Sequence, residues 1–229
     1  MTWLTPAGVA AALLVGVAVW WGLGWAGLVP LFAFLLSGSV LTRVATGRGA
    51  ARRARQVLAN GGVTAAAALV GSWPAAMGAL AAATADTWAT EIGAFSPSAP
   101  HDIATGEPVP RGRSGGITPL GTMGGVLGAI AIAGLAAAVA PPARFGLAGA
   151  MLAAAAGICG MLGDSLLGAT LQGRYACPVC HATAELPGTC HAPRTLARGV
   201  SWLDNDAVNL AGSSVGALVA AIGWRVLTR

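Results

Sequence analysis

Charge is scarce in this chain, and one kind of charged residue is missing altogether. Charged residues make up 9% of the 229 positions, against about a quarter in a typical soluble domain. All thirteen basic residues are arginine, because the sequence contains no lysine. The absence of lysine excludes a P-loop lysine and a Schiff-base lysine. The shortage of charge excludes an ordinary soluble domain, since 55% of the residues are hydrophobic.

Long apolar stretches take the place of the missing charge. The mean hydropathy is +0.71, and several segments reach the ~20 residues that cross a hydrocarbon core of about 30 Å. The first segment has no positive charge before it and no cleavage motif after it, so we expect a retained membrane helix. The fold class expected is all-α, a polytopic integral membrane helix bundle that forms a single domain over residues 1–229.

Apolar runs separated by turn residues predict seven transmembrane helices. Their expected ranges are Leu4–Trp21, Trp25–Thr42, Val57–Ser72, Pro74–Gly93, Pro119–Ala140, Phe145–Leu171 and Asp206–Trp224. Residues 43–60 form a basic linker with five arginines, which the positive-inside rule makes cytoplasmic. The N-terminus then lies inside and the C-terminus outside, in a plasma membrane of bacterial type. Loops 94–118 and 172–205 also fall on the cytoplasmic side. Orientation explains the arginines, so no nucleic-acid partner is expected.

Four polar stretches converge on the cytoplasmic leaflet in this topology. They are "DTWATEIG" (86–93), "GITPLGTMGGVLG" (116–128), "GDSLLGATLQ" (163–172) and "WLDNDAVN" (202–209). A carboxylate in the bilayer costs about 2.5–3.5 kcal/mol on insertion scales, and clustered carboxylates repel one another in a low dielectric. Mg²⁺ resolves this repulsion, because it takes oxygen ligands and bridges to phosphates. The expected ligands are Asp86, Glu91, Asp164, Asp204 and Asp206, of which Asp86, Asp164 and Asp206 are the catalytic candidates.

Glycines and arginines near residue 119 predict a phosphate site. Glycine lets backbone approach a ligand, and a helix start offers free N–H groups and a positive dipole end. The expected phosphate- or nucleotide-binding residues are Arg111, Arg113, Gly121, Thr122, Gly124, Gly125, Asn205 and Asn209. Gly121/Gly125 and Gly212/Gly216 also have the small-xxx-small spacing of close helix packing. Asp204 could instead cap a helix start, and Asp102 and Glu107 are expected to be solvated loop acids.

The loop "CPVCHATAELPGTCH" contains three cysteines and two histidines. In a reducing cytoplasm, Cys-x-x-Cys with a further cysteine and histidine favours a small structural zinc site over a disulfide. The expected ligands are Cys177, Cys180, Cys190 and one histidine, for which His191 is our candidate. Each histidine directly follows a cysteine, which makes simultaneous coordination awkward and leaves the fourth ligand open.

Five ordered motifs resemble the transmembrane protein 19 family, also called the domain-of-unknown-function 92 family. They are "RQVLANGGVTAAAAL", "DTWATEIG", "GTMGGV", "GDSLLGATLQ" and "WLDNDAVN", and the resemblance spans roughly residues 52–220. That family includes the phytyl-phosphate kinase of chloroplast tocopherol synthesis and is similar to membrane enzymes that use CTP, such as dolichol kinase and phosphatidate cytidylyltransferase. The resemblance implies phosphoryl transfer from CTP or ATP to an isoprenoid monophosphate.

Three functions remain open from the sequence. The first is a Mg²⁺-dependent isoprenoid-phosphate kinase, an enzyme that binds a membrane lipid and a nucleoside triphosphate. Such an enzyme could work as a monomer or as an oligomer. The second is a cation- or proton-coupled transporter, whose intramembrane acids would line a pathway. The third is a CTP-dependent lipid cytidylyltransferase. The depth of the acids discriminates against the transporter, because transporter sites favour the midplane and broken helices.

Overall fold

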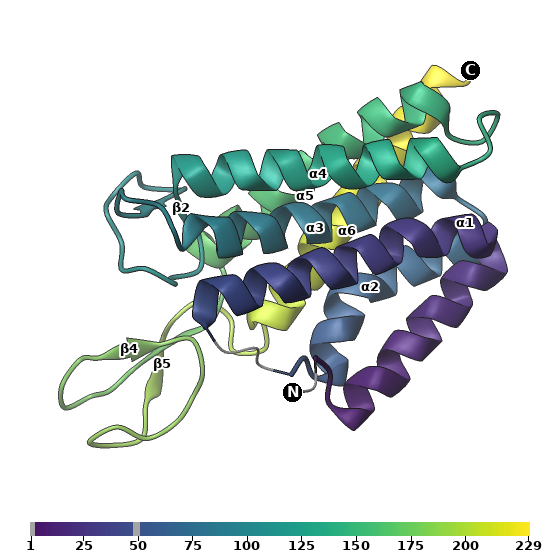
Figure 1. Cartoon of the computed structure of the whole chain (residues 1–229). Coiled ribbons are helices and arrows are strands. Elements are labelled where there is room, and N and C mark those ends of the chain that lie inside the picture. The colour runs from purple at the N-terminus through teal and green to yellow at the C-terminus, as the bar shows by residue number, and fades with distance from the viewer. Residues whose placement is uncertain (1–2, 48–50) are drawn as a thin grey trace.

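The computed structural model describes residues 3–47 and 51–229, and Arg48 of the basic linker lies outside the described residues. The described chain is mostly helical, as expected, and forms one bundle (Figure 1). The helices are α1 (Pro6–Thr46), α2 (Ala54–Leu69), α3 (Trp73–Gly93), α4 (Pro119–Val139), α5 (Gly146–Thr170) and α6 (Asn205–Leu227).

Helix α1 is a hairpin of two helical legs rather than one straight rod. Gly24 has φ 70° and ψ −170°, outside the helical region, and only glycine adopts such a conformation without strain. The chain reverses there, so the second leg runs back beside the first (Figure 1). The two legs correspond to the first two helices expected from the sequence. The described residues therefore contain seven helical segments in the expected order.

Helix α3 is the centre of the bundle. It packs against each of the other five described helices, and every residue from Trp73 to Ala85 is buried. Small side chains allow this close approach: a Cβ added at Gly216 of α6 would lie 2.5 Å from the carbonyl oxygen of Gly78. The packing role expected for Gly212/Gly216 is confirmed, because a Cβ at Gly212 would also lie 3.0 Å from the Gly160 carbonyl.

Four described helices, α1, α4, α5 and α6, are long and apolar enough to cross a membrane. The seven crossings and the sidedness stay predictions. The arrangement of the helix ends is consistent with an odd number of passes. Residues just before α1 and α2 bond to each other, since the Thr5 N–H donates to the Arg52 carbonyl. Arg55 of α2 pairs with Asp204 at the start of α6, so the far end of α6 lies at the opposite end of the bundle (Figure 1).

Short strands occupy the two polar loops, which the all-α expectation did not include. Strands β1 (His101–Asp102) and β2 (Gly116–Ile117) form an antiparallel pair. Strands β3 (Arg174–Ala176), β4 (Thr183–Ala184) and β5 (Thr195–Arg198) form a sheet in the order β4-β3-β5. These strands lie at one end of the bundle, where α3 and the second leg of α1 also end (Figure 1).

The expectation that Asp102 is solvated is wrong. Asp102 is 4% exposed, and its Oδ1 accepts hydrogen bonds from the backbone N–H groups of Ala104 (2.9 Å) and Thr105 (3.3 Å). The carboxylate therefore holds the turn after β1, a common use of aspartate in loops. Glu107 is exposed, as expected.

Candidate functional site

A cavity of about 470 Å³ opens at the end of the bundle that carries the strands. Helices α3, α4, α5 and α6 and the loop before α4 all contribute to its wall. Most of the residues expected to form the site line this cavity: Asp86, Glu91, Arg111, Arg113, Gly121, Thr122, Asp164, Asn205 and Asn209. Motifs separated by more than 100 residues along the chain therefore meet in one place.

Asp86 and Asp164 form a carboxyl pair between α3 and α5. Both residues line the cavity and a narrow space between α3, α5 and α6, and their carboxyl groups lie close enough to interact electrostatically. With its amide nitrogen turned toward α5, Asn209 of α6 donates to Oδ2 of Asp164 at 3.0 Å. The Ser213 hydroxyl lines the same narrow space and is buried with no hydrogen-bond partner in the described part of the chain.

The carboxyl pair offers what a hard cation requires. Both salt bridges formed among the described residues belong to Arg55, so no arginine of the described chain neutralises Asp86 or Asp164. Two adjacent carboxylates in a protein interior repel each other strongly. Carboxylate, amide and hydroxyl oxygens are the donors that Mg²⁺ binds, and this donor set fits the ion.

Glu91 lies at the edge of the cavity, one turn beyond Asp86 on α3. Its Oε1 accepts a hydrogen bond of 2.6 Å from the hydroxyl of Thr42 in the second leg of α1. The Arg52 guanidinium is close enough to interact electrostatically with this carboxylate. Glu91 is thus already engaged by a hydroxyl and an arginine, whereas no described arginine pairs with Asp86 or Asp164.

The structure gives Asp204 and Asp206 another partner. Arg55 makes contacts of 2.7 and 2.9 Å with the Asp204 carboxylate and one of 3.5 Å with Asp206. Asp204 also caps α6, because its Oδ1 accepts from the Ala207 N–H at 3.1 Å. The capping alternative for Asp204 is therefore confirmed. Neither acid is among the residues that line the cavity, so the cluster of five carboxylates expected from the sequence is not assembled there.

The glycines of "GTMGGV" divide into two groups. Gly121 lines the cavity together with Thr122 and also packs on α3, where an added Cβ would lie 2.7 Å from the Ala89 carbonyl oxygen. Gly124 and Gly125 only face neighbouring helices. A Cβ at Gly124 would press on Ile92, and one at Gly125 would lie 2.8 Å from the Ala85 carbonyl. Gly124 and Gly125 are packing residues here. The start of α4 also has one fewer free donor than expected, because the Gly121 N–H donates to the Thr118 hydroxyl at 3.0 Å.

Arginines stand opposite the carboxyl pair on the loop before α4. Arg111 donates to the carbonyl oxygens of Ser96 (2.7 Å) and Ser98 (3.3 Å), while the Arg113 Nε is buried without a partner in the described residues. Gly115 docks this loop on α5: its φ is 81°, and a Cβ there would lie 2.5 Å from the Ala169 Cα. Only glycine fits such a position.

A third arginine, Arg174 of β3, supports the same loop. Arg174 donates to the Ser114 carbonyl at 2.9 Å. Burial lowers the pKa of Arg174 from its ordinary value, and the neighbouring Arg113 and Arg198 lower it further. This concentration of positive charge beside the cavity is suited to phosphate oxygens.

Sequence reasoning missed Glu185 and Ser114. Glu185 belongs to the cysteine loop, yet it lines the cavity and accepts a 3.0 Å hydrogen bond from the Ser114 N–H. No spacing pattern marks Glu185, because it is a single acid in a loop whose cysteines carry the recognisable signal. The contact depends on how the β3–β5 sheet folds back over the bundle.

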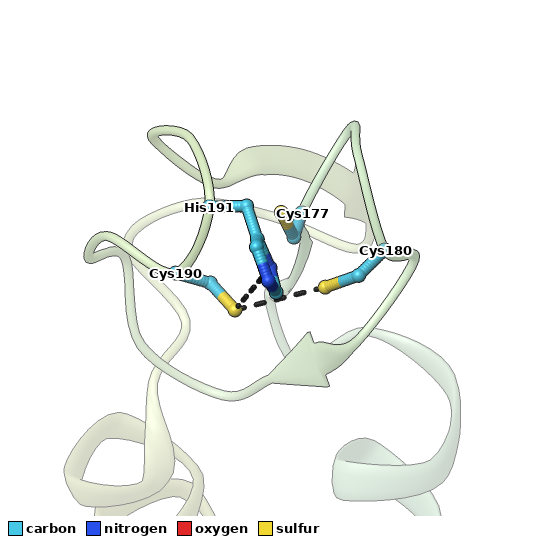
Figure 2. A group of neighbouring side chains, drawn as sticks. All are labelled: Cys177, Cys180, Cys190 and His191. Carbon is cyan, nitrogen blue, oxygen red and sulfur yellow. Dashed lines mark hydrogen bonds between the residues drawn. The ribbon is translucent and has the colours of Figure 1, made fainter.

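The cysteine loop brings four potential zinc ligands together. One ligand atom from each of Cys177, Cys180, Cys190 and His191 lies within 4.8 Å of all the others, and the side chains point toward a common centre (Figure 2). Cys177 directly follows β3, Cys180 lies in the turn toward β4, and the other two precede β5. The adjacent Cys190 and His191 both face inward, so their succession in sequence does not prevent joint coordination.

The spacing of these atoms matches a tetrahedral zinc site. Zn–S bonds near 2.3 Å and Zn–N bonds near 2.0 Å place ligand atoms about 3.8 Å (S–S) and about 3.5 Å (S–N) apart. The Cys180 and Cys190 sulfurs are 3.6 Å apart, and the Cys190 sulfur is 3.4 Å from the His191 Nδ1. Backbone N–H groups of Cys180 and Val179 donate to Cys177 and lower the pKa of its thiol to about 6. A thiolate is the form that binds metal.

Comparisons with known proteins agree with the sequence motifs. A family model described as integral membrane protein DUF92 matches residues 1–217. Protein PGR of Arabidopsis thaliana is 34% identical over 58% of this chain and 48% of its own length, so the match spans about half of that protein. An uncharacterised membrane protein of Methanocaldococcus jannaschii is 33% identical over 72% of this chain and 73% of its own length.

A third relative covers nearly the whole chain. The chloroplastic protein VTE6 of Arabidopsis thaliana is 24% identical over 97% of this chain and 66% of its own length. No solved structure matches. The match of the family model over nearly the whole chain confirms the resemblance carried by the five motifs: the chain belongs to the DUF92 family of integral membrane proteins.

Proposed function

We propose that this protein is a membrane kinase that transfers a phosphoryl group from CTP or ATP to an isoprenoid monophosphate. The observation that carries the proposal is the polar cavity, where the Asp86–Asp164 pair faces the arginine loop at one end of an apolar bundle. The family resemblance supports the same reaction, since that family includes a phytyl-phosphate kinase. The cavity's position at the end of the bundle argues against the transporter alternative.

The reaction needs positioning and charge neutralisation more than a strong base. An oxygen lone pair of the lipid monophosphate attacks the terminal phosphorus of the nucleotide. The bond from that phosphorus to its bridging oxygen breaks, and the nucleoside diphosphate leaves with the electron pair. The attacking oxygen is already anionic at neutral pH, so the absence of lysine and of a cavity histidine is no obstacle. Arg111 and Arg113 would hold phosphate oxygens.

Asp86 and Asp164 would hold a Mg²⁺ ion, with Glu91 at the edge of the cavity as a further candidate ligand. The bound ion would stabilise charge on the phosphate oxygens. Asn209 would orient the Asp164 carboxylate through its 3.0 Å hydrogen bond. Asn205 and Thr122 line the cavity near this pair and would contact the nucleotide or the lipid phosphate.

The Cys177–Cys180–Cys190–His191 group would hold a structural Zn²⁺ ion. Its role would be to fix the loop that presents Glu185 to the cavity, because the short β3–β5 sheet has little core of its own. We place the cavity on the cytoplasmic face of the membrane, since nucleoside triphosphates are available there and the positive-inside rule puts the basic linker on that side.

One experiment tests the reaction directly. Purified protein in detergent is incubated with Mg²⁺, prenyl alcohols or prenyl monophosphates, and CTP or ATP carrying label in the terminal or the α-phosphate. Transfer of terminal label to a prenyl monophosphate supports the proposal. Transfer of α-label with release of diphosphate indicates the cytidylyltransferase. Absence of any labelled lipid with every acceptor contradicts the proposal, and ion flux in proteoliposomes would then favour the transporter.

A further inference from the structure

A second cavity, of about 510 Å³, lies between the two legs of α1 and α2. We propose that this groove binds the isoprenoid chain of the lipid monophosphate and that Arg52 at its mouth binds the phosphate. The inference rests on the proposed function for the class of substrate. The inference adds which residues would bind the isoprenoid chain of that substrate and which would bind its phosphate.

The groove has the shape and the lining that a hydrocarbon chain requires. Its walls are apolar, formed by Leu13, Val17 and Trp20 of the first leg, Leu31 and Phe34 of the second leg, and Val57 of α2. The first leg rises by about 16 Å between Val9 and Trp20, at about 1.5 Å per residue. That length accommodates several isoprene units in a row. The space beside Gly16 is empty, because a Cβ added there would meet nothing within 4 Å. A larger side chain at this position would therefore project into the groove.

One end of the groove is charged. Arg52 lines it, with the guanidinium carbon 5.8 Å from the centre of the Phe34 ring. The guanidinium lies over Gly38, where an added Cβ would be 2.8 Å from an Arg52 nitrogen and 3.2 Å from Thr87. Arg52 makes no salt bridge within the described chain, and the Glu91 carboxylate interacts with it only through longer-range electrostatics. A half-buried guanidinium beside an apolar channel complements an anionic head on an apolar chain.

Asn60 joins this groove to the carboxyl pair. Asn60 is one of the residues that line the groove, and it also lines the narrow space that contains Asp86, Asp164 and Asn209. Arg52 also lies near the polar cavity, because its guanidinium is close enough to interact electrostatically with Glu91, which lines that cavity. A lipid whose chain fills the groove therefore presents its head toward the cavity where we place phosphoryl transfer.

Two glycines make a matched pair for testing the groove. Gly16 and Gly62 both sit in helices and both have open space at the Cβ position, but only Gly16 lines the groove. Gly16→Phe should lower kcat/KM for geranylgeranyl phosphate by about tenfold or more, the scale on which a filled apolar pocket discriminates. Turnover of dimethylallyl phosphate, whose chain is too short to reach Gly16, should stay within about twofold. Gly62→Phe should alter neither substrate. Equal behaviour of the two variants toward the long substrate overturns the assignment.

Arg53 provides the matched control for a test of Arg52. Arg52→Gln should raise KM for both lipid phosphates by about tenfold, the scale of losing a charged hydrogen bond, with partial recovery in Arg52→Lys. Arg53→Gln should leave KM unchanged, because Arg53 is exposed and lies outside the groove lining. An unchanged KM in Arg52→Gln removes Arg52 from the phosphate site.

A binding measurement separates this inference from the proposed reaction. A geranylgeranyl phosphate with a diazirine at the chain end is photolysed on the protein, and the labelled peptides are mapped. Labelling of α1 and α2 that Gly16→Phe abolishes and Gly62→Phe retains supports the groove, even if the protein transfers no phosphoryl group. Labelling spread over the outer faces of α4 and α5 shows that the chain binds elsewhere. Labelling by a phosphate-free geranylgeranyl diazirine at equal strength would assign the groove to bilayer lipid.

Discussion

Glu185 and Ser114 connect the cysteine loop to the wall of the polar cavity. The Glu185 carboxylate accepts hydrogen bonds from both the backbone N–H and the hydroxyl of Ser114, and both residues line the cavity. Ser114 in turn follows Arg113 and is bonded through its carbonyl to Arg174. Any change that loosens the cysteine loop is therefore expected to reach the residues that would hold phosphate.

Removal of zinc should test this connection. We expect about one zinc per chain by elemental analysis of the purified protein. The double variant Cys177→Ala/Cys180→Ala should lose the metal and show a lower kcat/KM for the nucleotide. Cys159→Ala is the matched control, since Cys159 lies in α5 away from the loop and should keep both metal and activity. A metal-free wild-type protein with full activity would contradict the zinc proposal.

Glu185→Gln should affect the cavity without affecting the metal. The neutral amide keeps the shape of the side chain but weakens a charge-assisted hydrogen bond that contributes about 1.5–3 kcal/mol. We expect KM for the nucleotide to rise several-fold, with zinc content unchanged. Glu107→Gln serves as control, because Glu107 is an exposed acid on another loop. Normal kinetics in Glu185→Gln would show that the loop only covers the cavity.

Gly216 should be intolerant of a side chain. A Cβ there would lie 2.5 Å from the Gly78 carbonyl and 2.8 Å from the Ala82 Cβ, so α6 would have to move away from α3. Overpacking of this kind destabilises proteins by about 1–3 kcal/mol. We expect Gly216→Ala to lower the melting temperature in detergent, whereas Gly62→Ala, which has open space, should leave it unchanged or raise it. Equal melting temperatures would mean that α6 adjusts freely.

The orientation in the membrane is testable with reporters. A reporter fused after Arg229 should lie outside the cell, and one inserted in the loop 97–110 should lie inside. Both results are expected because the arginine-rich linker determines which side the polar loops occupy. The reverse result in the loop 97–110 would place the cavity on the face that lacks nucleoside triphosphates. The reverse result after Arg229 alone would contradict the seven crossings.

The helices could be predicted from the sequence because each obeys a local rule. Apolar runs of alanine and leucine end at glycine, proline or arginine, and Gly24 and Pro74 mark reversals that the structure contains. The convergence of Asp86, Asp164 and Asn209 also followed from sequence, since helix direction alone assigns each motif to one end of the bundle. Topology determines the membrane leaflet in which a residue lies, and for these three residues that was sufficient to predict that they come together.

Knowing the membrane leaflet in which a residue lies does not determine which partner its side chain faces. Asp204 and Asp206 lie at the expected end of the bundle, but they turn toward Arg55, which the sequence placed in the basic linker. Gly124 and Gly125 lie in the expected motif but face Ile92 and Ala85. The side of a helix that meets a cavity depends on helix rotation and packing, which the spacing of residues does not specify. Glu185 was missed for the related reason that its partner lies 71 positions away.

The carboxyl pair provides the sharpest test of the proposed chemistry. Replacing aspartate by asparagine preserves shape and hydrogen bonding but removes the charge that would hold the cation. Asp86→Asn and Asp164→Asn should each lower turnover by about 10²-fold or more, the scale of losing one preorganised electrostatic contact. Both variants should melt at the same temperature as wild type or higher, because two unneutralised carboxylates repel each other in the metal-free protein. A purely structural role predicts the opposite, a lower melting temperature with turnover near normal.

Asp206→Asn then separates the two assignments of that residue. The sequence placed Asp206 beside Asp86 and Asp164 as a catalytic acid, whereas the structure places it 3.5 Å from Arg55. We expect Asp206→Asn to retain much more activity than Asp86→Asn or Asp164→Asn, measured as prenyl-phosphate turnover on the same preparations that give the melting temperatures. An equal loss in all three variants would mean that α6 rotates Asp206 into the cavity when substrate binds. Full activity in Asp86→Asn and Asp164→Asn would refute the magnesium site and leave the pair a role in assembly or ion movement.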